Sequence, residues 1–259
     1  MNISLNMDKK LKIALAQLNP LVGDVSGNIK KLISIRSKLD DDIDILVAPE
    51  LYVSGYPIDD LVLREDFLNL VEQEINKLVK STEDNKSAII VGAPRKDNES
   101  IKNSVFVIEN GKIISIKDKY ELPNTGVFDE QRIFKQGPLE DCVEIKGVKF
   151  GLPICEDIWE STVLKKLCSS GAEIIIAINA SPFTTSKSDE RSSVTSLRVD
   201  EIKLPIIYLN RTGGQDELIF DGSSFALNHD GKKFYSSSEF KEETSVVDFQ
   251  KLNGKWIGT

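Results

Sequence analysis

Short apolar runs alternate with amphipathic stretches along most of the chain. The continuous apolar runs at residues 43–48 and 88–93 are typical of strands that are covered on both faces. In residues 25–39 and 61–79 the apolar positions recur at roughly helical spacing, which predicts helices packed on a sheet. This alternation predicts a layered α/β fold.

The rest of the chain follows the same pattern. Further strands are expected at residues 11–18, 150–154, 173–179 and 206–210, helices at 159–168 and 188–202, and a hairpin with arms 103–109 and 113–119. Residues 217–249 are predicted to form mostly strands and turns. We expect residues 1–10 to form a loose tail and residues 11–259 a single domain, because nothing in the composition marks a boundary.

Composition limits the partners and the location. The chain has 259 residues, 40% of them hydrophobic, and a formal net charge of -8, which argues against nonspecific binding to nucleic acid or to an anionic membrane. It contains no apolar run long enough to span a membrane. The three cysteines are an odd number without the C-x-x-C spacing of metal sites, and we see no leader sequence, so we expect a reducing, cytoplasmic location.

One cysteine stands where a nucleophile would. Cys155 follows an apolar strand and precedes a predicted helix, and Asp157 is placed to cap that helix. The positive end of a helix favours the thiolate form of a cysteine, which is the nucleophilic form. A buried structural cysteine fits the local pattern equally well.

Two charged residues also lie at predicted strand ends. Glu50 follows the apolar run at 43–48, and Lys119 ends the second arm of the hairpin. A buried glutamate can replace histidine as the base, and a lysine can stabilise an oxyanion. The only histidine, His229, falls in a polar turn, which disfavours Cys–His catalysis and His-based zinc binding, so we predict no metal. Taken singly, Glu50 and Lys119 are also compatible with plain surface charges.

Three segments resemble the motifs of the nitrilase superfamily of carbon–nitrogen hydrolases, in the same order. Residues 48–51 resemble its base motif, 119–124 its lysine motif and 154–157 its nucleophile motif. Longer segments resemble the glutaminase domain of glutamine-dependent NAD synthetases, namely residues 54–61, 155–159, 179–183 and 213–225.

This resemblance implies a four-layer α-β-β-α sandwich and a set of roles. Glu50 would be the general base, Cys155 the nucleophile and Lys119 the stabiliser of the tetrahedral intermediate, with Glu130 as a supporting carboxylate. Glutamine would be hydrolysed to glutamate and ammonia through a thioester on the cysteine.

The resemblance also implies contacts to the substrate. These map onto Tyr56, Phe128, Glu156, Trp159, Ser181 and Lys187. Lys187 would bind the α-carboxylate of glutamine, and Arg191 is the alternative for that role. The chain departs from the family at Thr125 and at residues 184–187, which concerns the shape of the substrate pocket and not the triad.

Glutamine-dependent NAD synthetases of this type carry a second domain that uses ATP and nicotinic acid adenine dinucleotide. We expect that domain, and any cofactor, to be absent from this chain. Residues 212–217 resemble its pyrophosphate loop only superficially, and we interpret them as a turn between strands. A partner NAD synthetase domain or subunit is therefore expected, together with a homodimer or higher oligomer. Two alternatives remain: a free-standing amidase acting on another ω-amide, a carbamoyl compound or a nitrile, and a noncatalytic binding module with the same fold.

Overall fold

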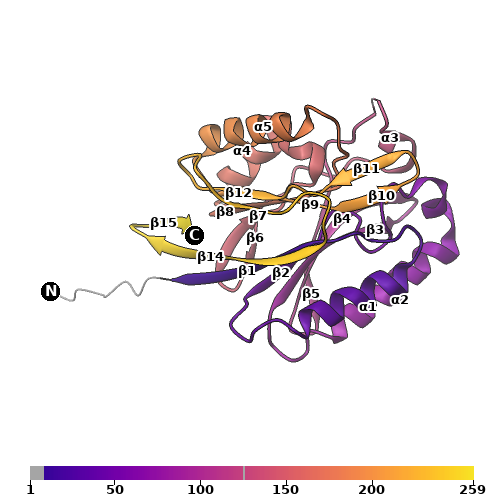
Figure 1. Cartoon of the computed structure of the whole chain (residues 1–259). Coiled ribbons are helices and arrows are strands. Elements are labelled where there is room, and N and C mark those ends of the chain that lie inside the picture. The colour runs from indigo at the N-terminus through magenta and orange to yellow at the C-terminus, as the bar shows by residue number, and fades with distance from the viewer. Residues whose placement is uncertain (1–8, 125) are drawn as a thin grey trace.

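The computed structural model describes residues 9–124 and 126–259, so Thr125 and most of the expected tail lie outside the described residues. Two β-sheets stack face to face, and helices cover the outer side of each sheet (Figure 1). The first strand begins at Lys10, one residue before the expected start of the domain. The predicted alternation of strands and helices therefore folds into four layers.

The first sheet has seven strands in the order β15-β14-β1-β2-β3-β4-β5. Its strands are β1 (Lys10–Gln17), β2 (Ile45–Val47), β3 (Ala88–Asp97), β4 (Ser100–Glu109), β5 (Lys112–Asp118), β14 (Glu243–Leu252) and β15 (Lys255–Gly258). Strands β1, β2 and β3 are parallel, whereas β4 and β5 continue as antiparallel hairpins. The parallel strands β2 and β3 are buried on both faces, as their unbroken apolar runs predicted.

The second sheet has six strands in the order β13-β12-β9-β8-β7-β6. They are β6 (Val143–Ile145), β7 (Val148–Gly151), β8 (Ile174–Asn179), β9 (Ile206–Asn210), β12 (Phe225–Leu227) and β13 (Lys233–Ser236). A separate hairpin joins β10 (Thr212–Gln215) to β11 (Leu218–Asp221). The expected turn at 212–217 is therefore shorter than predicted, because residues 212–215 pair as a strand and the turn falls on Asp216 and Glu217.

Four helices form the two outer layers. They are α1 (Val25–Arg36) and α2 (Glu65–Lys80) on the first sheet, and α4 (Ser161–Ser169) and α5 (Lys187–Ile202) on the second. The helix expected at 61–79 is broken at Arg64, whose extended backbone separates a 3-10 turn, Asp59–Leu63, from α2. Among the described helices, none is long and apolar enough to cross a lipid bilayer.

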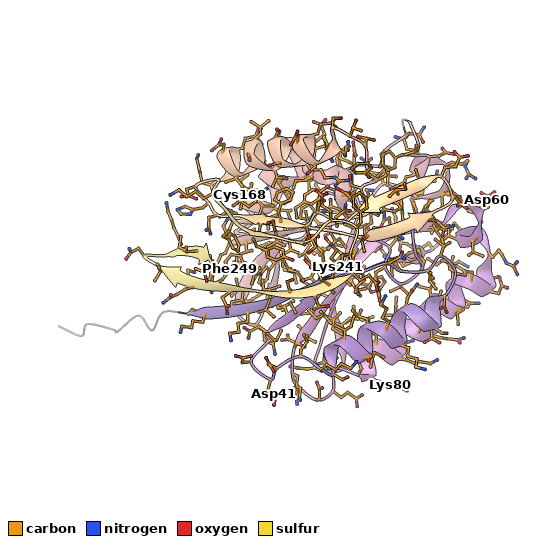
Figure 2. All side chains as sticks on the ribbon, in the orientation of Figure 1. Asp41, Asp60, Lys80, Cys168, Lys241 and Phe249 are labelled. Carbon is orange, nitrogen blue, oxygen red and sulfur yellow. The ribbon has the colours of Figure 1, made fainter. Side chains whose placement is uncertain are left out.

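Alternation along each strand separates the core into layers. In β1, Ile13 and Leu15 pack between the sheets, whereas Ala14 and Ala16 face the helices α1 and α2. The small alanines allow the helices to lie close to the sheet. Side chains fill the space between the ribbons, including Phe249 of β14 between the sheets (Figure 2).

Candidate active site

Glu50 lies just beyond the end of β2 and is fully buried. Its Oε2 accepts a hydrogen bond of 2.9 Å from the backbone N–H of Ala180, which follows β8 in the opposite sheet. Gly92 of β3 permits this arrangement, because a Cβ at that position would lie 2.7 Å from the Cα of Glu50 and 2.3 Å from the N of Leu51. The glutamate is therefore held at the contact between the two sheets.

Lys119 follows β5 directly, and its side chain is 0% exposed. Its Nζ lies 2.8 Å from Oε1 of Glu50 and 2.9 Å from both carboxylate oxygens of Glu130. Burial disfavours the ammonium, but Glu130 and Glu50 outweigh it and raise the pKa of Lys119 well above its ordinary value. Lys119 is therefore a fixed positive charge at neutral pH.

Glu130 opens a short helix, α3 (Glu130–Ile133), and is also buried. Burial raises the pKa of Glu130 to about 7, although the ammonium of Lys119 favours its charged form. The hydroxyl of Tyr56 donates to Glu130 Oε1 over 3.1 Å. The structure thus brings Glu130 and Tyr56, both predicted site residues, into direct contact.

Cys155 begins a 3-10 turn, Cys155–Ile158, and is only 4% exposed. Its φ angle of 47° is in the left-handed region, which is strained for a residue with a β-carbon. The preceding Ile154 forms a parallel bridge with Ile178 of β8, so the second sheet fixes where the turn begins.

The surroundings of Cys155 oppose the thiolate that its place in the sequence favours. Burial, reinforced by the carboxylate of Glu50, raises the pKa of the Cys155 thiol well above its ordinary value, and the opposing effect of Lys119 is smaller. The helix α4 begins only at Ser161, six residues after the cysteine, so Cys155 is not at the first turn of that helix. Because its pKa is raised, the thiol of Cys155 relies on a base to take up its proton before it attacks.

Asp157 does not cap the helix that it was predicted to cap. Its Oδ2 accepts from the N–H of Ile154 over 2.9 Å, and its Oδ1 accepts from the N–H groups of Tyr120 and Glu121 over 3.1 and 2.7 Å. These bonds join the turn that carries Cys155 to the segment that follows Lys119. Asp157 thereby fixes the cysteine turn against the lysine segment, a role that the sequence did not indicate.

Three of the predicted substrate contacts, Glu156, Trp159 and Lys187, lie near one another. The Nζ of Lys187, at the start of α5, lies 4.0 Å from the ring centroid of Trp159 and 3.4 Å from a carboxylate oxygen of Glu190. Glu156 is half-buried, and burial raises its pKa against the effects of Lys119 and Lys187. Phe128, another predicted contact, is partly buried against the core under α1 and α2.

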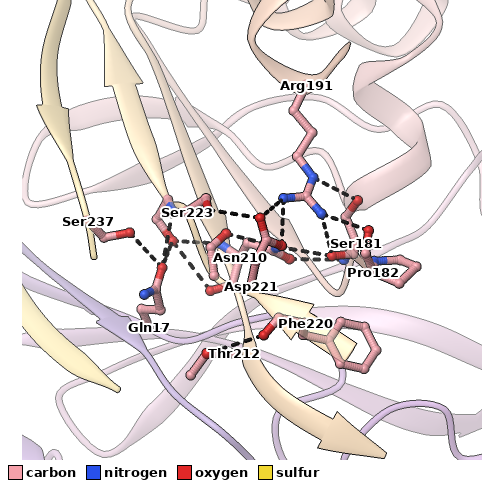
Figure 3. Close-up of polar contacts among 12 residues, drawn as sticks. Gln17, Ser181, Pro182, Arg191, Asn210, Thr212, Phe220, Asp221, Ser223 and Ser237 are labelled. Atoms are coloured by element: carbon pink, nitrogen blue, oxygen red, sulfur yellow. Dashed lines mark hydrogen bonds and ion pairs between the residues drawn. The ribbon is translucent and has the colours of Figure 1, made fainter. Parts of the chain in front are cut away.

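Arg191 is the exception among the predicted contacts, because all of its donors are already used. Its guanidinium donates to both oxygens of Asp221 over 2.8 Å, to the carbonyls of Ser181 and Pro182 over 2.8 Å, and to Ser181 Oγ over 3.1 Å (Figure 3). These contacts use all five N–H groups of an arginine. The structure therefore contradicts the expectation that Arg191 can bind a substrate carboxylate, and gives it the role of holding the loop that contains Ser181.

Asn103 of β4 is a site residue that the sequence analysis did not identify. Its side-chain amide donates to Glu50 Oε1 over 2.8 Å, and its backbone carbonyl accepts from the backbone N–H of Lys119 over 2.8 Å. The available signal was the predicted hairpin, which places residue 103 opposite residue 119. Among the described residues, no group of three or more His, Cys, Asp and Glu side chains could hold a metal ion.

Comparison with known proteins identifies the family. The sequence profile of the family described as Carbon-nitrogen hydrolase matches residues 12–257. The chain belongs to the carbon-nitrogen hydrolase family. This confirms the membership expected from the three motifs.

Several relatives with similar sequences are glutamine-dependent NAD(+) synthetases. The chain is 37% identical over 251 residues to the glutamine-dependent NAD(+) synthetase of Rhodobacter capsulatus, covering 96% of this chain and 45% of that protein. It is 37% identical over 243 residues to the protein of the same name from Thermotoga maritima, covering 93% of this chain and 42% of that protein. The chain thus spans about half the length of the curated relatives it matches.

Solved structures of carbon-nitrogen hydrolases have the same fold. The glutamine-dependent NAD+ synthetase from Acinetobacter baumannii superimposes with a TM-score of 0.87 at 34% identity, covering 96% of this chain and 47% of that chain. A carbon-nitrogen hydrolase from Helicobacter pylori gives a TM-score of 0.80 at 20% identity, covering 92% of this chain and 88% of that chain, which concerns the fold alone. The expected nitrilase-like α/β sandwich is confirmed.

Proposed function

We propose that this chain is a glutamine amidohydrolase that releases ammonia and glutamate through a thioester on Cys155. One arrangement carries the proposal: the buried thiol of Cys155 interacts electrostatically with Glu50 and Lys119, and Lys119 is held between the carboxylates of Glu50 and Glu130. The similarity to glutamine-dependent NAD(+) synthetases supports glutamine as the amide.

The geometry suggests how the first half of the reaction proceeds. Oε2 of Glu50 takes the thiol proton, and the sulfur of Cys155 attacks the side-chain amide carbon of glutamine. The ammonium of Lys119 stabilises the negative charge that develops on the amide oxygen. The tetrahedral intermediate collapses as the nitrogen receives the proton from Glu50, which releases ammonia and leaves a γ-glutamyl thioester.

The second half repeats these steps with water. Glu50 removes a proton from a water molecule, which attacks the thioester carbon, and Lys119 again stabilises the oxyanion. The carbon–sulfur bond breaks, and the sulfur recovers its proton from Glu50. Glu130 contributes by binding the lysine ammonium with both of its oxygens, which fixes the direction of the positive charge.

Charge complementarity suggests how glutamine is oriented. Lys187 supplies a positive charge for the α-carboxylate, while Glu156 supplies a negative charge for the α-ammonium group. Both groups influence each other electrostatically in the folded chain, which supports a common subsite. Trp159 and Ser181 complete the proposed wall of this subsite, Trp159 by stacking under Lys187.

The proposal extends to partners and location. Residues 11–259 act as one glutaminase domain, and the ammonia is used by an NAD synthetase domain or subunit that consumes ATP and nicotinic acid adenine dinucleotide. The three free thiols support a cytoplasmic location.

We also propose a homodimer through the outer face of α4 and α5, where the side chain of Leu197 is 51% exposed. Light scattering that gives only a monomer at high concentration would contradict this.

The test measures glutamate release with and without an ammonia-dependent NAD synthetase and its two substrates. We expect slow hydrolysis by the chain alone, loss of turnover in Cys155→Ala, and acceleration by the synthetase that corresponds to a coupling of about 1–3 kcal/mol. Cys168→Ala, which changes a thiol on the outer helix α4 (Figure 2), is the matched control and should keep the wild-type rate.

Other outcomes point to the alternatives. Fast turnover of another ω-amide, a carbamoyl compound or a nitrile, with glutamine ignored in both conditions, would assign the chain to the free-standing amidases. If Cys155 forms no covalent adduct with a glutamine-like electrophile and no substrate is turned over, the chain is a noncatalytic module.

A further inference from the structure

Asn103 contacts two groups of the proposed catalytic cluster at once. It is 1% exposed and lies on β4, where its backbone carbonyl accepts a hydrogen bond from the backbone N–H of Lys119. Its side-chain amide donates over 2.8 Å to Oε1 of Glu50, the same oxygen that receives the ammonium of Lys119 over 2.8 Å. One asparagine therefore sets the position of the lysine backbone and of the glutamate side chain.

These contacts make the two oxygens of Glu50 unequal. Each carboxylate oxygen has about two lone-pair positions for hydrogen bonds. Oε1 has two donors, from Asn103 and Lys119, whereas Oε2 has one, from the backbone of Ala180. Only Oε2 therefore keeps a position that can receive a proton from Cys155.

We propose that Asn103 is a positioning residue that occupies Oε1 of Glu50 and so directs the proton of Cys155 to Oε2. This rests on the proposed function, in which Glu50 is the base and Cys155 the nucleophile. Without the amide, Oε1 has one donor, Lys119, just as Oε2 has one donor, Ala180, so both oxygens keep an open position and the proton of Cys155 is no longer directed to Oε2. An error of about 1 Å in such a geometry lowers a rate by about 10²-fold.

A purely structural role explains Asn103 less well. Its Oδ1 is buried and has no hydrogen-bond partner among the described side chains and backbone groups, a condition that disfavours the folded state. A leucine of similar size would remove this unpaired acceptor together with the donor. The unpaired Oδ1 therefore offsets part of the stability that the amide gains from its bond to Glu50, in contrast to the next residue, Ser104, whose hydroxyl donates to Asp118 over 2.6 Å.

The experiment compares Asn103→Leu with Ser104→Ala, a buried polar control on the same strand. For Asn103→Leu we expect kcat for glutamine to fall about 10²-fold, KM to change less than about 3-fold, and the melting temperature to stay within about 4 °C of the wild type. Ser104→Ala should lower the melting temperature and leave kcat unchanged. If the leucine does not fold, Asn103→Ala removes the same donor with less bulk.

A second measurement does not depend on glutamine. Alkylation of Cys155 by iodoacetamide at pH 7, followed by mass spectrometry of the peptide, also requires removal of the thiol proton, and Asn103→Leu should slow it about 10-fold or more. If the wild type hydrolyses no amide, the proposed function fails, and alkylation still decides the role of Asn103. The inference would be overturned if Asn103→Leu kept the wild-type kcat and alkylation rate. It would also be overturned if the variant lost activity only in proportion to a fall in its melting temperature.

Discussion

Replacing Lys119 with methionine removes a buried charge that two carboxylates depend on. The side chain is 0% exposed and makes three contacts of 2.8–2.9 Å with Glu50 and Glu130. Methionine is unbranched and only one heavy atom shorter than lysine, so the change is mainly one of charge. Removing one partner of a buried ion pair costs about 3–5 kcal/mol, because the remaining charge is left uncompensated. We expect that loss in the free energy of unfolding at pH 8.

The loss should depend on pH in a definite direction. Burial raises the pKa of Glu130 to about 7 in the folded wild type, above the ordinary value of 4.5, so this group stabilises the fold at low pH and loses that contribution as pH rises through about 7. The ammonium of Lys119 opposes this shift, and without it the pKa of Glu130 rises further. The variant is therefore least destabilised near pH 5, where Glu130 is protonated, and most above pH 8.

Urea unfolding at pH 5 and pH 8 measures both effects. Lys102→Met is the matched control, because Lys102 is also buried but donates over 2.7 Å to the neutral carbonyl of Gln136. Its loss should be about 1 kcal/mol and the same at both pH values. A deficit for Lys119→Met below about 1 kcal/mol, or one that does not change between pH 5 and pH 8, would refute the reasoning.

Two further predictions concern substrate binding and the cysteine turn. Lys187→Ala should raise KM for glutamine about tenfold with little change in kcat. Arg191→Lys should instead lower the melting temperature, since lysine cannot replace the paired contacts to Asp221. A larger effect on KM from Arg191→Lys than from Lys187→Ala would assign the binding of the α-carboxylate to Arg191. Asp157→Asn should lower the free energy of unfolding by about 1–3 kcal/mol, because the single amide oxygen of asparagine cannot accept from all three N–H groups that the two carboxylate oxygens bind. Thermal and urea denaturation check this, and unchanged stability contradicts it.

The sequence predicted those parts of the fold that depend on local patterns. Unbroken apolar runs located β2 and β3, and the turn signal around Asn110 located the hairpin of β4 and β5. It missed β6, because this strand is as short as β2 but has a glutamate at its centre and so is not an unbroken apolar run. It also extended α2 through Arg64, where apolar spacing continues across a backbone that is extended.

The candidate site could be predicted only where single residues stand in motifs. Glu50, Lys119 and Cys155 came from motif resemblance, whereas the contacts of Asn103, Asp157 and Arg191 could not be read from the sequence. Asn103 meets a glutamate 53 residues away, and Arg191 meets an aspartate 30 residues away. Such pairs depend on how the strands and loops pack in three dimensions, which local spacing does not encode. The raised pKa of the Cys155 thiol could not be read from the sequence either, since it follows from burial.

Neither sheet alone holds the complete set of proposed reacting groups. Glu50, Lys119 and Asn103 extend from strands of the first sheet, while Cys155 and the N–H of Ala180 follow strands of the second. The distance between base and thiol therefore depends on the thickness of the apolar layer between the sheets. Core side chains such as Ile178 and Leu15 act as spacers for the chemistry. A change of one methyl group there alters the alignment of the reacting groups before it unfolds the chain, so selection for turnover reaches residues that never meet the substrate.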